Sequence, residues 1–209
     1  MKSLAVVFVG ALVLAGCGGV RYPTSYVLNF PPPAPHAAAS NGVLGPVAIR
    51  EFRCADYLCE GRIVYRPNPE EVGFYEYHRW AANPRQAITQ YLEDGLRAQL
   101  LFSSVAVHER GPKAAYVLSG NIQRLEEVDQ GRDVRAVCTI SAQLLDTRTS
   151  SVVWSQTASE TVPVEKRDIR GVVSSLSAAA RTAADRLLSS MREELPATIA
   201  QTGALIHPQ

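Results

Sequence analysis

Residues 134–145 read VRAVCTISAQLL, and this stretch decides the fold class. Apolar and polar side chains alternate along it, with a period of two residues. Such a period is that of a β-strand with one covered face and one face that is at least partly in water. The stretch therefore predicts a strand of an antiparallel sheet. Its apolar side would carry Val134, Ala136, Cys138, Ile140, Ala142 and Leu144, and its polar side Arg135, Thr139, Ser141 and Gln143.

Further strands are predicted on both sides of this stretch. Residues 146–150 form a polar turn, after which Val152–Thr157 returns as the partner strand. Upstream, the proline-rich residues 67–71 separate two β-rich runs and predict a hairpin with a long turn. The runs that predict the remaining strands are Tyr26–Phe30, Val47–Phe52, Arg62–Arg66, Val72–Tyr77, Val105–Val107 and Tyr116–Leu125.

Two segments have the three- and four-residue spacing of apolar side chains that predicts an amphipathic helix. The first begins at Asn83-Pro84, with Asn as the N-cap and Pro at the first helical position, and runs to about Phe102. The second begins at Asp168, which also suits an N-cap, and runs to Leu195. Pro196 is expected to end it, because proline lacks the amide donor that a helix interior needs.

Together these elements predict one α+β domain over residues 26–195. Its sheet is expected to be mostly antiparallel, with two long helices packed on one face, because each amphipathic element must bury its apolar side against another. Residues 17–25 precede the domain as a short tether. Residues 196–209 lack periodicity and are expected to form a disordered tail.

The first residues carry the pattern of a secretory signal. Lys2 is followed by the uncharged apolar run 4–15, and Gly16 places a small residue before Cys17. The run is too short to span a bilayer, for which a helix needs about 20 apolar residues. Residues 1–16 are therefore expected to be a signal peptide that is removed.

Residues 14–17, Leu-Ala-Gly-Cys, resemble the lipobox of bacterial lipoproteins, in which the cysteine is diacylated and becomes the new N-terminus. Cys17 is accordingly the expected lipidation site, with a diacylglycerol and an N-acyl chain such as palmitate. The alternative is an ordinary signal peptide followed by an incidental cysteine. Two or three acyl chains anchor a protein stably, at about 0.8 kcal/mol per buried methylene. Gly18 replaces the Asp that marks inner-membrane retention in many Gram-negative lipoproteins, which favours the outer membrane by analogy.

The chain contains four cysteines, of which three remain once Cys17 is lipidated. In an oxidising compartment Cys54 and Cys59 are the expected disulfide pair, because a short loop can bring them within bridging distance. Two unpaired thiols are one alternative. A metal site is another, with weak support because no histidine or second cysteine pair lies near them. Cys138 is expected to be a small, buried apolar residue.

No catalytic pattern is found in the sequence. It lacks Gly-x-Ser-x-Gly, His-Glu-x-x-His, a phosphate loop and Gly-x-Gly-x-x-Gly. The Glu pairs at 70/71, 126/127 and 193/194 are interpreted as solvated turns or helix ends, because adjacent residues do not face each other. The charges nearly balance, with 21 Lys and Arg against 20 Asp and Glu, so no overall field attracts nucleic acid. No enzyme activity, metal or cofactor is predicted. The four histidines are scattered at His36, His78, His108 and His207.

A cluster of aromatic and basic residues occupies the predicted hairpin and the residues that follow it. One interpretation is that half of the cluster is core and half is surface. The functional interpretation is a contact surface for a protein partner, because Tyr, Trp and Arg are enriched at interface hot spots. A lipid-binding groove is a further alternative. The cluster comprises Tyr65, Arg66, Phe74, Tyr75, Tyr77, His78, Arg79 and Trp80, of which Tyr65, Arg66, Tyr77, Arg79 and Trp80 are the candidate partner-binding residues.

The order of these features resembles the ABC-type transport auxiliary lipoprotein family, which includes PqiC-like proteins. The likeness covers nearly all of the chain after the signal, and its motifs are short and aromatic. No counterpart of the loop between Cys54 and Cys59 is recognised in the family pattern. The features that carry the resemblance are the lipobox, Tyr26-Val27-Leu28, the strand Val47–Phe52, Ile63-Val64-Tyr65-Arg66, Tyr77-His78-Arg79-Trp80 leading through Asn83-Pro84 into a helix, Val152-Val153-Trp154 and the Ala-rich last helix.

The resemblance implies a non-enzymatic accessory subunit, anchored in the outer membrane and facing the periplasm. Such proteins work with an ABC ATPase, a permease and an MCE-domain protein that moves lipids or other hydrophobic molecules between the membranes, and some form homo-oligomeric rings. The alternative is an envelope-assembly or cell-wall-regulating lipoprotein with a TolB-N-like domain, which would bind a protein partner without a transporter. An enzyme of unrecognised type is a third class.

Overall fold

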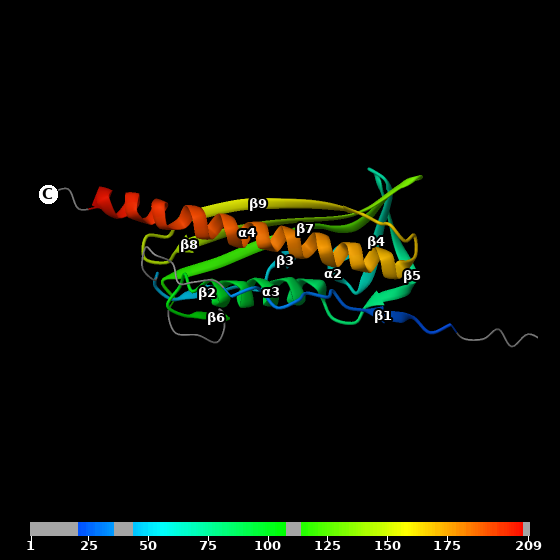
Figure 1. The fold of residues 1–209 in the computed structure, drawn as a ribbon, viewed down its shortest axis with the longest axis horizontal. Helices are drawn as coiled ribbons and strands as arrows, with labels where there is room; N and C mark the ends of the chain where they lie inside the picture. Colours follow the sequence, from blue (N-terminus) through cyan, green and yellow to red (C-terminus); the bar gives the residue numbers. More distant parts are fainter. Residues whose placement is uncertain (1–20, 36–43, 108–113, 207–209) are drawn as a thin grey trace, which may run out of the picture.

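A curled mixed sheet forms the body of the protein in a computed structural model, which describes residues 21–35, 44–107 and 114–206 (Figure 1). Within these residues the sheet has nine strands, and three helices accompany it. The strands are β1 (Thr24–Tyr26), β2 (Val47–Ile49), β3 (Arg53–Cys54), β4 (Arg62–Asn68), β5 (Glu71–Trp80), β6 (Val105–Val107), β7 (Tyr116–Gln130), β8 (Asp133–Asp146) and β9 (Ser151–Pro163). The helices are α2 (Asp56–Cys59), α3 (Pro84–Gln99) and α4 (Ile169–Ile206).

The three longest strands pair in antiparallel fashion, as the alternating sequence of 134–145 predicts. Strand β8 lies between β7 and β9 and pairs with both along most of its length. The predicted hairpin is also present, with β4 and β5 antiparallel. The shorter strands are different: β2, β3 and β4 pair with the other edge of β7 in parallel, β6 pairs with β2 in parallel, and β1 pairs with β5 in parallel. The α+β class is therefore confirmed, with a mixed sheet.

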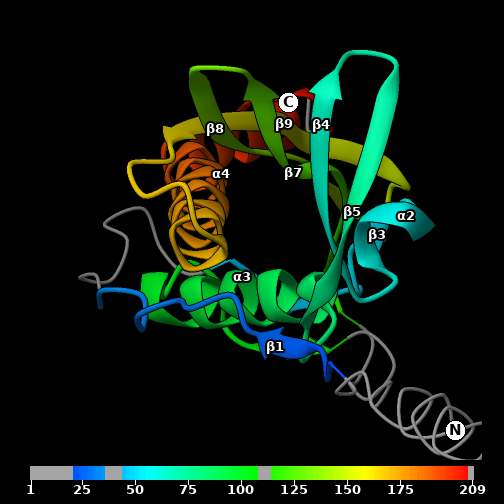
Figure 2. The ribbon, with the colours of Figure 1, turned by 90° about the vertical axis from the view of Figure 1, so that its right-hand side faces the viewer.

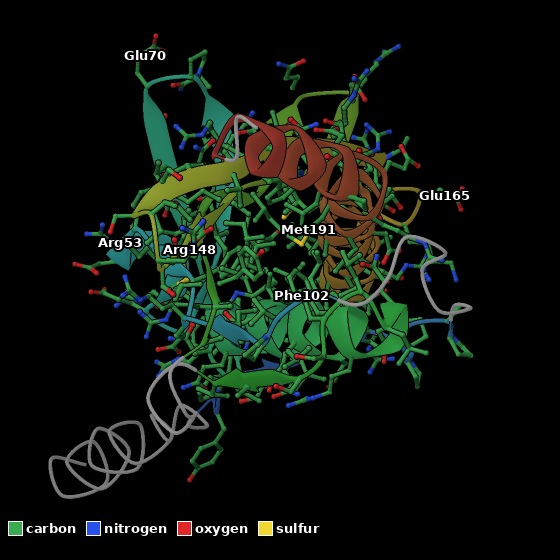
Figure 3. All side chains as sticks on the ribbon, turned by 90° about the vertical axis from the view of Figure 1, so that its left-hand side faces the viewer. Arg53, Glu70, Phe102, Arg148, Glu165 and Met191 are labelled. Carbon is green, nitrogen blue, oxygen red and sulfur yellow. A yellow bond between two sulfur atoms is a disulfide. The ribbon has the colours of Figure 1, made fainter. Side chains whose placement is uncertain are left out.

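The core lies on the side of the sheet that the two long helices cover. Figure 2 shows the sheet curling from β9 through β7 to β5 around α4 and α3. The apolar side of β8 is buried there as predicted, and Cys138 is a buried free thiol. Met191 of α4 and Phe102, which follows α3, are also buried and lie in the interior (Figure 3). Burial of this apolar face is what holds the helices on the sheet.

Both predicted helix starts are correct. The side chain of Asn83 accepts a hydrogen bond from the backbone amide of Arg85 at 3.0 Å, and Pro84 begins α3. The carboxylate of Asp168 accepts from the backbone amide of Gly171 at 2.7 Å at the start of α4. These bonds satisfy amide donors that the first turn of a helix otherwise leaves free.

The predicted end of the last helix is wrong. Helix α4 continues to Ile206 with Pro196 inside it, so residues 196–206 are helical and not a disordered tail. A proline removes one backbone donor and crowds the turn before it, which can kink a helix without ending it. The alanines at 197 and 200 are good helix formers and favour continuation.

The predicted tether also overlaps the domain. Strand β1 begins at Thr24, inside the range 17–25 assigned to the tether, and only Tyr26 of the expected strand Tyr26–Phe30 lies in it. After β1 the chain crosses to α4, where the backbone amide of Asn29 donates to the hydroxyl of Ser177 at 3.1 Å. The expected signal peptide and Cys17 lie outside the described residues.

Candidate functional site

The hairpin of β4 and β5 projects from the body of the sheet (Figure 2). Glu70 lies at its tip, where its backbone amide donates to the side chain of Asn68 at 3.2 Å (Figure 3). Gly73 lets the ring of Tyr65 lie across β5, because a Cβ atom at this glycine would come within 2.2 Å of that ring. The candidate partner-binding residues are spread along this hairpin, and the structure places them in different environments.

One face of the hairpin holds an aromatic cluster on a buried carboxylate. The rings of Tyr65 and Tyr75 meet edge to face with centroids 5.4 Å apart. The Tyr75 hydroxyl donates to Glu127, which is buried. Burial raises the pKa of the Glu127 carboxyl, although the hydrogen bond from Tyr75 opposes this shift. Burial, and then the bond to Glu127, raise the pKa of Tyr75, so its hydroxyl keeps its proton and remains the donor.

An ion-pair network attaches the hairpin to β7. The Arg66 guanidinium donates through Nε to both carboxylate oxygens of Glu126 at 3.1 Å and through Nη2 to Oε2 at 3.0 Å. Arg124 reaches the same carboxylate at 2.7 Å. The Glu126 side chain is fully buried, whereas that of Arg66 is 19% exposed. Arg66 also donates to the carbonyl of Pro69 at 2.9 Å, so its guanidinium is already bonded to acceptors within the protein.

The interpretation of Glu126 and Glu127 as a solvated pair is wrong. Both are buried in β7. Because successive side chains of a strand leave opposite faces, Glu126 pairs with Arg66 on one face and Glu127 with Tyr75 on the other. A bulge between Ile122 and Arg124 shifts the alternation of β7 just before them. The spacing of Arg124 and Glu126, two residues apart on one strand face, is the sequence signal that could have indicated the ion pair.

Trp80 is not part of an exposed patch. Its side chain is 7% exposed and belongs to the hydrophobic core. It ends β5 beside β1, where it pairs with Tyr26, and its backbone amide donates to the carbonyl of Gly61 at 2.8 Å. Its expected role as a contact residue is therefore corrected to a core role.

Tyr77 and Arg79 are exposed at the end of the hairpin that pairs with β1. The guanidinium of Arg21 lies over the Tyr77 ring, 5.7 Å from its centroid. Beside them, the Tyr26 hydroxyl is 3.4 Å from Nδ1 of His78, whose ring contacts Tyr75. The predicted patch is thus divided: Tyr65 and Arg66 lie toward the tip, Tyr77 and Arg79 at the β1 end, and Trp80 in the core.

Cys54 and Cys59 are joined by a disulfide with their Cα atoms 6.2 Å apart. The bridge spans the short helix α2, which the sequence does not predict, and this helix buries Leu58 in the domain. The two other possibilities for these cysteines, free thiols and a metal site, do not apply to the structure.

The described residues contain no group of three or more His, Cys, Asp or Glu side chains that could hold a metal ion. Of the four histidines only His78 falls within them, and it lies at the aromatic cluster. In the part of the chain that the structure describes, no helix has both the length and the hydrophobicity needed to span a membrane.

The family model described as ABC-type transport auxiliary lipoprotein component matches residues 26–187, and the chain belongs to this family. The resemblance seen in the sequence is therefore confirmed. A comparison with curated proteins gave no match.

Solved structures support the fold. A protein of Xanthomonas campestris from the DUF330 family is 20% identical, with a TM-score of 0.72 over 86% of this chain and 99% of its own. An uncharacterized protein is 14% identical, with a TM-score of 0.63 over 81% of this chain and 99% of its own. A hypothetical protein of Chlamydia trachomatis is 8% identical, with a TM-score of 0.50 over 74% of this chain and 99% of its own. At these identities the likeness concerns the fold.

Proposed function

We propose that this protein is a non-enzymatic accessory subunit of an ABC transport system that carries lipids or other hydrophobic molecules across the cell envelope. The observation that carries the proposal is the family match over residues 26–187, which includes strands β2 to β9 and the first half of α4. Its partners are an MCE-domain protein and the permease and ATPase of the same system. A homo-oligomeric ring belongs to the same proposal, and native mass spectrometry of the purified lipoprotein tests it.

The lipid anchor on Cys17 is part of the proposed function. It holds the domain at the periplasmic side of the outer membrane, where a transport partner that spans the periplasm arrives. The proposal rests on the lipobox-like residues 14–17. The change Cys17→Ser should abolish acylation in a mass spectrum of the N-terminal peptide and release or mislocalise the protein. An unmodified Cys17 in the wild-type protein would contradict the anchor.

The tip of the hairpin is the proposed contact for the transport partner. Arg66 and Pro69 line a pocket of about 630 Å³ between β4 and β7 at this end. The Tyr65 ring lies on the opposite face of the hairpin, against Tyr75. The ion pair of Arg66 with Glu126 fixes the hairpin on the sheet, so the surface is already shaped before a partner binds. Rigid aromatic side chains at such a surface contribute contact area at a low entropic cost.

Co-purification tests the transport assignment directly. The tagged lipoprotein, isolated from membranes after mild crosslinking, should bring down an MCE-domain protein and an ABC subunit. The Cys17→Ser variant serves as the control for capture that does not depend on the anchor. If the wild-type protein brings down neither subunit, the transport assignment is wrong. Capture of an envelope-assembly or cell-wall protein in their place would favour the alternative assignment.

A further inference from the structure

Two exposed arginines face each other at the β1 end of the hairpin. Arg62 and Arg79 are directly opposite partners on β4 and β5, so their side chains leave the same face of the sheet. Within the described residues no carboxylate forms an ion pair with either of them, or with Arg21 nearby. Like charges that lie opposite each other on adjacent strands are destabilising unless an anion lies between them.

Aromatic rings accompany these arginines. Arg62 lies over the ring of Phe74 at 5.4 Å from its centroid, as Arg21 lies over Tyr77. The side chains of Phe74 and Tyr77 are 36% and 37% exposed, and that of Tyr22 is 82% exposed. Aromatic rings combined with arginine are typical of surfaces at the membrane–water interface, where one end of the side chain is in contact with apolar groups and the other is in water.

The position of this surface relative to the anchor identifies its occupant. This step rests on the proposed lipidation of Cys17. Arg21 is four positions after Cys17, so their Cα atoms are at most about 14 Å apart even in a fully extended chain. Because Arg21 contacts Tyr77 and β1 pairs with the end of β5, the surface is held close to the bilayer. A folded partner of 100 residues has a radius of gyration of about 13 Å, so little room is left for one between this surface and the membrane.

We propose that Arg21, Tyr22, Arg62, Phe74, Tyr77 and Arg79 form a membrane-facing surface that binds the phosphates of anionic phospholipid headgroups. The arginines supply the charge, and the three rings lie at the depth of the headgroups. The domain is then held on the bilayer in one orientation, with β1 and the adjacent end of β5 toward the lipid. The anchor alone would leave the domain free to rotate about its tether.

Photocrosslinking in membranes tests this surface with the full lipoprotein. Tyr77→p-benzoylphenylalanine keeps an aromatic side chain and should form phospholipid adducts, detected by mass spectrometry. The matched control is Val152→p-benzoylphenylalanine, because Val152 is 50% exposed and lies at the start of β9, at the opposite end of the molecule from β1 in Figure 1. Position 152 should give no phospholipid adduct. A protein adduct at position 77 in place of a lipid adduct would assign the surface to a partner and overturn the proposal.

Purified lipoprotein in vesicles tests the role of the arginines. Vesicles of phosphatidylethanolamine with phosphatidylglycerol should give a higher adduct yield at position 77 than vesicles of phosphatidylcholine. Adding Arg62→Gln and Arg79→Gln should reduce this yield by up to about fivefold for each arginine, whereas Arg148→Gln in the turn before β9 should not. Equal yields in both kinds of vesicle, or no effect of the two arginine changes, would contradict headgroup binding.

The N-terminal mass spectrum separates this proposal from the proposed function. An unmodified Cys17 removes the premise of both. A lipidated Cys17 without a lipid adduct at position 77 overturns the membrane-facing surface alone. A lipid adduct at position 77 together with a failure to capture any transport subunit supports this surface and contradicts the transport assignment.

Discussion

At the scale of single residues, Trp80 and Tyr77 show what the sequence of a strand can and cannot predict. They are three positions apart in β5, so alternation places them on opposite faces, and Trp80 is 7% exposed whereas Tyr77 is 37% exposed. The register between β4 and β5 is irregular, since Arg62 pairs with Arg79 whereas Val64 pairs with Phe74. Because this irregularity lies between Phe74 and Arg79, the pattern of the strand alone does not indicate which of its two faces turns toward the core. The sequence therefore indicated an aromatic cluster on the hairpin but not which of its members lie in the core.

The burial of Trp80 predicts a large effect on stability. We expect Trp80→Ala to lower the free energy of unfolding by about 3–5 kcal/mol, because it leaves a cavity in the core. The exposed Tyr77→Ala is the matched control and should change it by no more than about 0.5 kcal/mol. Urea unfolding followed by circular dichroism measures both. Equal stabilities of the two variants would contradict the core position of Trp80.

The raised pKa of Glu127 predicts a dependence of stability on pH. Between the ordinary value of 4.5 and the higher pKa in the folded protein, the folded state binds more protons than the unfolded state. The free energy of unfolding should therefore fall as the pH rises through this window. Glu127→Gln keeps an acceptor for Tyr75 but cannot ionise, so its stability should rise relative to wild type across the same window. The exposed Glu70→Gln is the control and should follow the wild-type curve.

At the scale of elements, strand patterns predicted most of the sheet but not the way in which the short strands pair. The alternation of residues 134–145 identified β8, and turn and capping residues identified the hairpin and both helix starts. The parallel pairing of β2, β3 and β4 with β7 could not be predicted, because contacts far apart in sequence set the register of such short strands. Similarly, Pro196 predicted the end of the last helix, whereas α4 continues through it to Ile206.

The attachment of the hairpin to β7 leads to a prediction at this scale. Arg66→Met leaves the buried Glu126 with Arg124 alone, and we expect it to lower the free energy of unfolding by about 3 kcal/mol. Adding Glu126→Leu removes the uncompensated charge and should restore most of this loss. Hydrogen exchange of the amides of β4 and β5 should become faster in the single variant and return toward wild type in the double variant. An additive loss in the double variant would show that the ion pair is not what holds the hairpin.

At the scale of the whole molecule, the hairpin connects the proposed partner contact at its tip with the proposed membrane-facing surface at the β1 end. Figure 2 shows its tip and β1 at opposite ends of the molecule, and the ten residues of β5 span about 30 Å between them. If the β1 end lies on the membrane, the tip points into the periplasm, where a transport partner would meet it. The sequence predicted the hairpin and its aromatic residues, but only the pairing of β1 with β5 shows which end lies near the anchor.

This arrangement predicts different crosslinks from the two ends of one hairpin. Glu70→p-benzoylphenylalanine at the tip should form protein adducts with a transport subunit and no phospholipid adduct, whereas position 77 should give the reverse. Because Glu70 is exposed and only its backbone amide serves the turn, the change should leave the fold intact by circular dichroism. Cells that lack the proposed MCE-domain partner should lose the adduct at position 70 and keep the one at position 77. Lipid adducts at both ends would mean that the domain has no fixed orientation on the membrane. The aromatic and basic residues at the two ends of the hairpin would then belong to one lipid-contacting surface.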